Sequence, residues 1–233
     1  MNQHIDKQFD AELETVRSSV LQMGGLVEEQ IVSAIDALSS GNVEQCNRII
    51  EADHRVNALE IEIDEQCSHI IARRQPTAID LRMILAVIKT ITDLERIGDE
   101  ASKIARMAKN LHERDQLQIP RYRDVKHMAD IAIDMLRRSL DAFARLDVSV
   151  PAKVVRLDEQ VDEEFQTIVR KLITFMMEDP RTISSSLEIL WVAKAIERIG
   201  DHAKNMSEYV VYLVKGKDVR HVSADELERE VGQ

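Results

Sequence analysis

The stretch Leu94–Asp99 reads LERIGD, and Ile196–Asp201 repeats it as IERIGD. Each copy lies in a long segment without proline, where apolar residues recur every three or four positions. This period is typical of an α-helix that packs along one side. In each copy a glutamate precedes an aspartate by four residues, so both carboxylates lie on one face of the helix. The sequence therefore predicts an internally duplicated helical protein whose repeats carry paired carboxylates.

The duplication extends well beyond these hexapeptides. Asp53–Asn57 corresponds to Asp158–Asp162 at an offset of 158 − 53 = 105, and Glu95 corresponds to Glu197 at 197 − 95 = 102. The small change in offset indicates short gaps near the prolines. The unit is far longer than the ~20–50 residues of a solenoid repeat. We therefore expect two related halves in tandem.

Prolines, glycines and short polar runs divide the chain into long helical segments, three in each half. Breaks are expected around Gly41, around Pro76 and around Pro180, because proline disfavours helix at the residue before it. The expected helices span about 7–38, 43–74, 78–112, 121–146, 150–177 and 183–214. The predicted fold class is all-α, with two tandem, internally duplicated three-helix bundles.

Domain boundaries follow from these breaks. The first three-helix repeat is predicted at residues 1–113, the second at 120–216, and a C-terminal tail at 217–233. The acidic end of the tail, Ser223–Gln233, is expected to be either a short extra helix or a frayed segment.

Composition narrows the function. The 233 residues carry a net charge of −11, which argues against direct binding to DNA, since nucleic acids attract concentrated basic charge. No apolar run approaches the ~20 residues of a membrane span. The polar start has no basic region followed by an apolar stretch, so no secretory signal is expected. We therefore expect a soluble, cytoplasmic protein.

Each half pairs the acids of its third helix with a similar set on its second. Glu95 and Asp99 project away from the apolar stripe of their helix, whereas Asp53 and Asn57 flank the apolar Val56. If the two helices are neighbours, oxygen ligands from both converge on one patch, which suits Mg²⁺, Mn²⁺ or iron. Acids four residues apart also commonly form a solvated face, so both interpretations stay open. Asn57 replaces an acid, which predicts that the first patch is the less negative one.

Neighbouring side chains offer further possibilities. His54 and His202 lie beside the acidic motifs and are candidate extra ligands, although an exposed histidine near acids is more often a hydrogen-bond partner. Arg96 and Arg198 can instead neutralise the carboxylates. A ferritin-like oxidase is not expected, because the second half has Glu159 where a second Glu-x-x-His element needs histidine. A Gly-rich phosphate loop, Gly-x-Ser-x-Gly, Cys-x-x-Cys and His-Glu-x-x-His are all absent, so the sequence predicts no enzyme.

The motifs together resemble the PhoU family over nearly the whole chain. Besides the two hexapeptides, the similar stretches are Met23–Glu28, Arg73–Pro76, Asp80–Arg82, Met177–Arg181 and Val210–His221. The resemblance implies a cytoplasmic accessory regulator of phosphate uptake. Such a protein links the phosphate-specific ABC transporter to a membrane sensor histidine kinase and keeps the phosphate-starvation (Pho) regulon repressed while phosphate is plentiful.

The resemblance also implies partners and ligands. A homodimer is expected, reaching the membrane only through its partners. In some members of this family the acid-x-x-x-Asp motifs bind multinuclear metal clusters, so the resemblance implies Mg, Mn, Fe or Zn as a possible cofactor. Carried over by position, the metal ligands are Asp53, Asn57, Glu95, Asp99, Asp158, Asp162, Glu197 and Asp201. The alternatives are a metal store or metal-dependent enzyme built on the two patches, and a scaffold whose acids serve only solubility.

Overall fold

The computed structural model describes residues 7–113, 122–220 and 222–231, and every regular element within them is helical. The elements are α1 (Lys7–Ser40), α2 (Val43–Arg74), α3 (Ala78–Glu113), α4 (Tyr122–Arg145), α5 (Pro151–Glu178), the 3-10 turn η1 (Pro180–Thr182), α6 (Ile183–Lys215) and α7 (Ala224–Val231). The all-α prediction is confirmed. The ends of the six long helices differ from the expected positions by at most two residues.

Local chemistry explains where the helices begin and end. The Asn42 side chain accepts a hydrogen bond from the Gln45 N–H at 3.0 Å and so caps the start of α2. After α2, Gln75 adopts a left-handed conformation with φ 45°, and Pro76 then prevents the helix from continuing. Gly216 closes α6 with φ 71°, a conformation that glycine adopts without steric cost.

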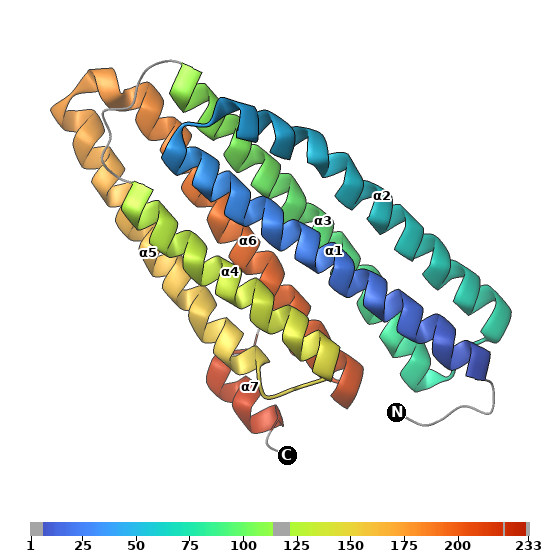
Figure 1. Ribbon diagram of the computed structural model, residues 1–233. Coiled ribbons are helices and arrows are strands. Elements are labelled where there is room, and N and C mark those ends of the chain that lie inside the picture. Colours follow the sequence, from blue (N-terminus) through green and yellow to red (C-terminus); the bar gives the residue numbers. More distant parts are fainter. Residues whose placement is uncertain (1–6, 114–121, 221, 232–233) are drawn as a thin grey trace.

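The six long helices form two three-helix bundles that share an interface (Figure 1). In the first half α1, α2 and α3 contact one another, and in the second half α4, α5 and α6 do the same. The halves meet through α3 against α6 and α1 against α4, so α2 and α5 lie at the outer edges.

Helices α3 and α6 run antiparallel. Near the start of α3, the Arg82 guanidinium donates to the Leu213 carbonyl near the end of α6 at 3.4 Å. At the other end, the Asn110 amide donates to Glu188 near the start of α6 at 3.5 Å. The carboxylate motifs, which lie in the middle of both helices, are thereby placed near the middle of the molecule.

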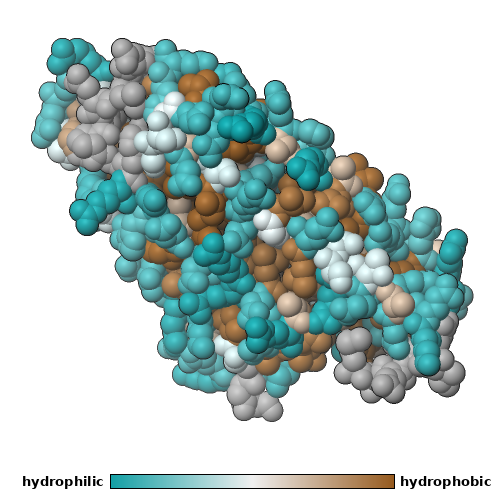
Figure 2. Space-filling model, viewed as in Figure 1, coloured by the Kyte–Doolittle hydropathy of each residue, from teal (hydrophilic) through white to brown (hydrophobic). Residues whose placement is uncertain are grey.

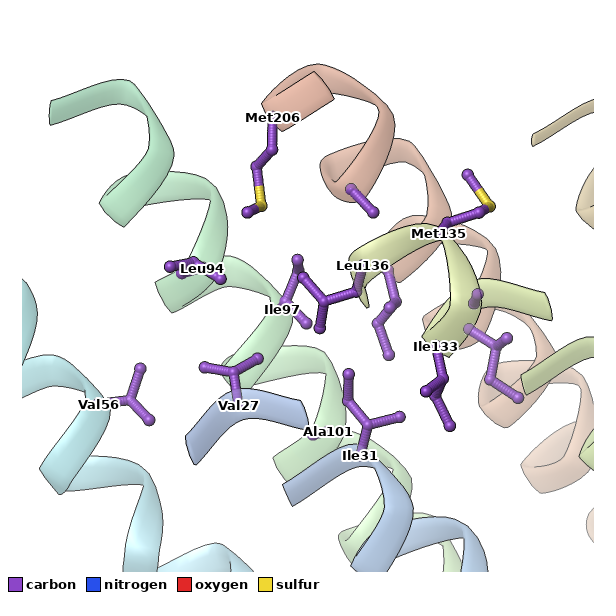
Figure 3. Close-up of a cluster of buried hydrophobic side chains, with 14 of the residues drawn as sticks. Val27, Ile31, Val56, Leu94, Ile97, Ala101, Ile133, Met135, Leu136 and Met206 are labelled. Atoms are coloured by element: carbon purple, nitrogen blue, oxygen red, sulfur yellow. The ribbon is translucent and has the colours of Figure 1, made fainter. Parts of the chain in front are cut away.

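One hydrophobic core continues through both halves. Figure 3 shows Val27 and Ile31 of α1 and Ile97 of α3 meeting Leu136 of α4, with Met206 of α6 beyond them. Small residues let the halves approach closely. A Cβ on Gly24 of α1 would lie 2.5 Å from the Leu140 side chain of α4. The two bundles therefore share one hydrophobic core and do not form two separate domains.

In the C-terminal tail, for which the sequence left a short helix and a frayed segment open, Ala224–Val231 form the helix α7. Leu227 of α7 is fully buried and packs with Val219 against Val155 of α5 and Val211 of α6. Among the described helices, none is long and apolar enough to cross a membrane. The face in Figure 2 is mostly hydrophilic, with apolar side chains showing through its middle.

Candidate functional site

The first group of predicted ligands lies where α1, α2 and α3 meet around Gly98. A Cβ built on Gly98 would lie 3.4 Å from the Gln30 Oε1 of α1, 3.4 Å from Val56 and 3.7 Å from the Asp53 Oδ1 of α2. Because glycine carries no side chain, α2 can bring Asp53 close to the backbone of α3. The acids on α2 and α3 therefore come from adjacent helices, as the sequence predicts.

The pKa shifts of these acids indicate that they lie close together. Burial, followed by repulsion from Asp99, raises the pKa of Asp53. Burial also raises the pKa of Glu95, with repulsion from Asp99 and Glu60 next in size. Two carboxylates raise each other's pKa only when they are close together in space. Three of the predicted residues are thus gathered, and Asn57 completes the set with a buried Oδ1 that makes no hydrogen bond.

Glu60 is a member of this patch that the sequence interpretation missed. Burial raises its pKa, and both Asp64 and Asp99 act in the same direction. It follows Asp53 by seven residues on α2, a spacing of two helical turns that signals a shared face. We call Asp53, Glu60, Glu95 and Asp99, together with the Asn57 amide, the first carboxylate cluster.

The second carboxylate cluster consists of Asp158 and Asp162 on α5 with Glu197 and Asp201 on α6. Burial raises the pKa of Asp201 to about 6, although part of the residue stays accessible, and the other three acids add to the rise. Burial, Asp158 and Glu197 raise the pKa of Asp162. All four predicted residues of this half therefore lie together.

Two lysines that the sequence interpretation did not include lie within the second cluster. The Lys204 ammonium donates to the Asp158 carboxylate at 2.7 Å, and the Lys194 ammonium donates to Glu197 at 2.6 Å. Within the described part of the chain, no lysine or arginine forms such an ion pair with an acid of the first cluster. Near the first cluster, Arg106 opposes the rise in the pKa of Asp53 and Arg96 opposes the rise in the pKa of Glu95. The expectation that Asn57 makes the first patch the less negative one stays a prediction.

Oxygen chemistry fits the implied metal ions, although the ligands are not pre-assembled. The Asp53, Asn57 and Glu197 side chains each hold a buried oxygen without a hydrogen bond, and Mg²⁺ and Mn²⁺ prefer carboxylate and amide oxygens. Among the described residues, however, no three or more His, Cys, Asp or Glu side chains lie close enough together to bind one metal ion in their present positions. Ligation would therefore require rotation of these side chains.

The remaining candidates face other groups. The His202 Nδ1 lies 2.7 Å from the Asp93 carboxylate of α3, and Arg198 lies 2.7 Å from Glu100, which Lys103 also contacts at 2.9 Å. Both residues of α6 therefore join polar contacts between the halves instead of the second cluster. His54 is exposed. Like Arg106, it opposes the rise in the pKa of Asp53 that burial causes.

Comparison with known proteins places the chain. Residues 20–108 and 125–210 each match the PhoU domain family, so the domain occurs once in each half. The chain is 48% identical over 232 residues to a phosphate-specific transport system accessory protein PhoU homologue of Pseudomonas putida, covering 99% of this chain and 90% of that protein. It is also 48% identical over 229 residues to the accessory protein PhoU of Escherichia coli, covering 98% of this chain and 94% of the relative.

Solved structures agree with these sequence matches. The crystal structure of PhoU from Pseudomonas aeruginosa superposes with a TM-score of 0.86 at 48% identity, covering 90% of this chain and 100% of that one. The phosphate transport system regulatory protein PhoU from Streptococcus pneumoniae superposes with a TM-score of 0.84 at 30% identity, covering 91% of this chain and 99% of that one. The duplicated three-helix bundles, the repeated hexapeptide and these full-length matches show that the chain belongs to the PhoU family.

Proposed function

We propose that this protein is a cytoplasmic negative regulator of the phosphate-starvation (Pho) regulon and a modulator of phosphate uptake. The observation that carries the proposal is similarity along the whole chain to proteins named as accessory or regulatory parts of the phosphate transport system. A partial match would support only the fold. Here both halves and the tail align, so any surface that a relative uses for regulation has a counterpart in this chain.

The proposed mechanism is that of a helical adaptor. The protein contacts the cytoplasmic subunits of a phosphate ABC transporter and a sensor histidine kinase, and it biases the kinase toward its phosphatase state. Long helices with exposed faces suit docking to other helical domains. A homodimer, which would present each face twice, is part of the proposal. A metal store or metal-dependent enzyme is not favoured, because the relatives are named as accessory proteins.

The deciding experiment measures a phosphate-starvation reporter, such as alkaline phosphatase, in cells that lack this protein and grow in ample phosphate. We expect high constitutive activity that falls when the gene is returned. Low activity in the deletion strain would contradict the regulatory role and leave only the fold assignment. A phosphate-uptake assay on the same strains tests the second part, since loss of the regulator should leave uptake unrestrained.

The regulatory surface is tested with the arginines of the two hexapeptides. If the exposed faces of α3 and α6 dock partners, Arg96→Ala should derepress the reporter in ample phosphate. Arg198→Ala should do the same, but its ion pair with Glu100 means that its protein level must be measured alongside. Unchanged repression by both variants at normal protein levels would exclude these positions from the docking surface.

We further propose that the carboxylate clusters bind metal ions of the Mg, Mn, Fe or Zn type as part of this regulator. The buried oxygens of Asp53 and Asn57 that make no hydrogen bond support the proposal, as does the mutual repulsion of the acids. Metal content should fall in purified protein when Glu95, Asp99, Glu197 and Asp201 are neutralised together. Retained repression in that variant would make the metal structural or incidental.

A further inference from the structure

A groove lies between α1 and α2, two helices that run side by side in the first half (Figure 1). Its volume is about 470 Å³, within the range of roughly 300–1,000 Å³ that small-molecule sites occupy. The floor is apolar and is formed by Leu26 of α1 with Ile49, Ala52 and Val56 of α2. The groove therefore has the size and the floor of a site for a small molecule.

The seam between α4 and α5, which corresponds to this groove in the second half, carries larger apolar side chains. At an offset of 105, Leu157 corresponds to Ala52 and Met135 to Gln30. Leu157 packs against the hydrophobic core, and Met135 is fully buried within it. The hollow in the first half therefore follows from its own side chains, in particular the small Ala52, and not from the crossing of two such helices.

Two arginines lie beside this floor. Arg48 and Arg55 both line the groove at exposed positions, and a spacing of seven residues puts them on one face of α2, about 10 Å apart along its axis. Neither forms an ion pair with any residue that the structure describes. Among the described residues of the lining, one is acidic, the exposed Glu29 of α1. Two guanidiniums against one carboxylate make the groove a positive patch on a chain whose net charge is −11.

Gln30 supplies a polar group at the wall of the groove. Its side chain lines the groove, the residue is only 8% exposed, and its Oε1 makes no hydrogen bond. Buried polar atoms are usually paired, so an unpaired one calls for a partner. Rotation of the amide turns this oxygen toward the groove, where it can accept a hydrogen bond from an amino group of a ligand. The Gln45 amide, which donates to the Ser33 carbonyl at 3.2 Å, ties the two walls together.

These groups together select a class of ligand. A guanidinium binds phosphate oxygens through two parallel hydrogen bonds and also stacks on flat aromatic rings. Orthophosphate has no apolar part to cover Ile49 and Val56, and it is small for a groove of this volume. A ligand with phosphate at one end and a flat ring carrying an amino group at the other matches the arginines, the floor and Gln30 at once.

We propose that this groove binds a nucleotide, with the base on the apolar floor and the phosphate groups at Arg48 and Arg55. The site uses no residue of either carboxylate cluster, so it does not depend on metal binding there. It is also independent of the proposed regulatory role. It would give the chain a small-molecule input in addition to its proposed protein partners.

The test is isothermal titration calorimetry of purified, full-length protein with ATP as the probe. EDTA in the buffer keeps divalent metal ions from bridging the phosphates to the carboxylate clusters. We expect one ATP bound per chain. Adenosine, which lacks phosphate, and orthophosphate, which lacks the base, should each bind more weakly by about tenfold or more. Tripolyphosphate that binds as tightly as ATP would overturn the proposal, because the site would then recognise charge alone.

Variants locate the site. Arg48→Gln and Arg55→Gln should each weaken ATP binding by about tenfold, because each removes a charged hydrogen-bond donor to phosphate. The control Arg73→Gln removes an exposed arginine of the same helix outside the groove and should leave the affinity unchanged. Ala52→Leu introduces the side chain of the second half and should weaken ATP and adenosine alike.

The outcomes decide the proposal without reference to the other roles. All three arginines are exposed, so their variants keep the test valid if Ala52→Leu fails to fold, which circular dichroism checks. No ATP bound by the wild type, or equal losses from Arg55→Gln and Arg73→Gln, would overturn the nucleotide site. The reporter experiment in cells decides the regulatory role separately, whichever result the titrations give.

Discussion

The Arg198 guanidinium of α6 lies 2.7 Å from the Glu100 carboxylate of α3, so an ion pair joins the two halves of the molecule. Glu100 is only 4% exposed and also accepts from Lys103 at 2.9 Å. A buried carboxylate needs such partners, because desolvation of an unpaired charge is costly. Arg96, the counterpart of Arg198, forms no ion pair among the described residues. The two arginines of the repeated hexapeptide therefore have different structural roles.

This difference predicts unequal effects on stability. Arg198→Ala should lower the free energy of unfolding by about 1–2 kcal/mol, below the usual cost of breaking a buried pair because the guanidinium is partly exposed and Lys103 remains. Arg96→Ala should change it by less than about 0.5 kcal/mol. Urea denaturation followed by circular dichroism measures both, and equal losses would contradict the prediction.

The shared core predicts that both halves unfold together. Ile97 is fully buried between α1 and α4 in Figure 3, so Ile97→Ala should cost about 2–5 kcal/mol. The variant should still show one transition, at a lower midpoint, in calorimetry and in circular dichroism. Ile61→Ala, at a side chain that is 60% exposed, is the control. Two separate transitions in the wild type would count against a continuous core.

Glu208 predicts a pH dependence of stability. Burial raises its pKa from 4.5 to about 7, with Lys204 opposing the rise. The folded protein therefore binds more protons than the unfolded chain between these values, and the free energy of unfolding falls as pH rises from about 4.5 to about 7. Glu208→Gln should remove this part of the slope and be more stable than wild type at pH 8, by on the order of 2 kcal/mol.

The measurement is the difference in unfolding free energy between wild type and Glu208→Gln across that pH range. Taking the difference cancels groups that titrate equally in both proteins. Glu159→Gln, at an exposed position of α5, should give no such trend. A difference that stays constant with pH would show that Glu208 titrates at its ordinary pKa.

Helix α7 should detach from the rest of the molecule more readily when the buried side chain of Leu227 is truncated. Leu227 of α7 is fully buried against α5 and α6, so Leu227→Ala should speed hydrogen exchange in Ala224–Val231 while leaving α3 protected. Arg229→Ala removes an exposed side chain from the same helix and should not change exchange. Faster exchange throughout the molecule would instead make α7 part of the main cooperative unit.

Sequence patterns predicted the helices well because their boundaries are local events. A proline disfavours a continuing helix whatever its tertiary surroundings, and α2 and α5 end just before Pro76 and Pro180. Gly216 ends α6 through its own backbone conformation. The grouping of Asp53 with Glu95 and Asp99 also followed from the repeat, since the same spacing on two adjacent helices recurs in both halves. These inferences needed no knowledge of how one half meets the other.

Two ion pairs that the sequence did not predict, Arg198–Glu100 and Lys204–Asp158, depend on how neighbouring helices face one another. The Arg198–Glu100 pair requires the antiparallel approach of α3 and α6, which apolar periodicity does not define. The Lys204–Asp158 pair joins side chains 46 positions apart across α5 and α6. A signal for it was present, however, because comparing the halves position by position shows lysine where Ser102 stands.

The fused core has an evolutionary consequence. The faces of α1 and α3 that now meet α4 and α6 are apolar, so a chain with only one repeat would expose them to water. A second copy of the same repeat, placed as the second half is here, would cover them. Once duplication joined the copies in one gene, each copy could accumulate substitutions without imposing them on its twin. Ser102 and Lys204 could diverge only after that joining.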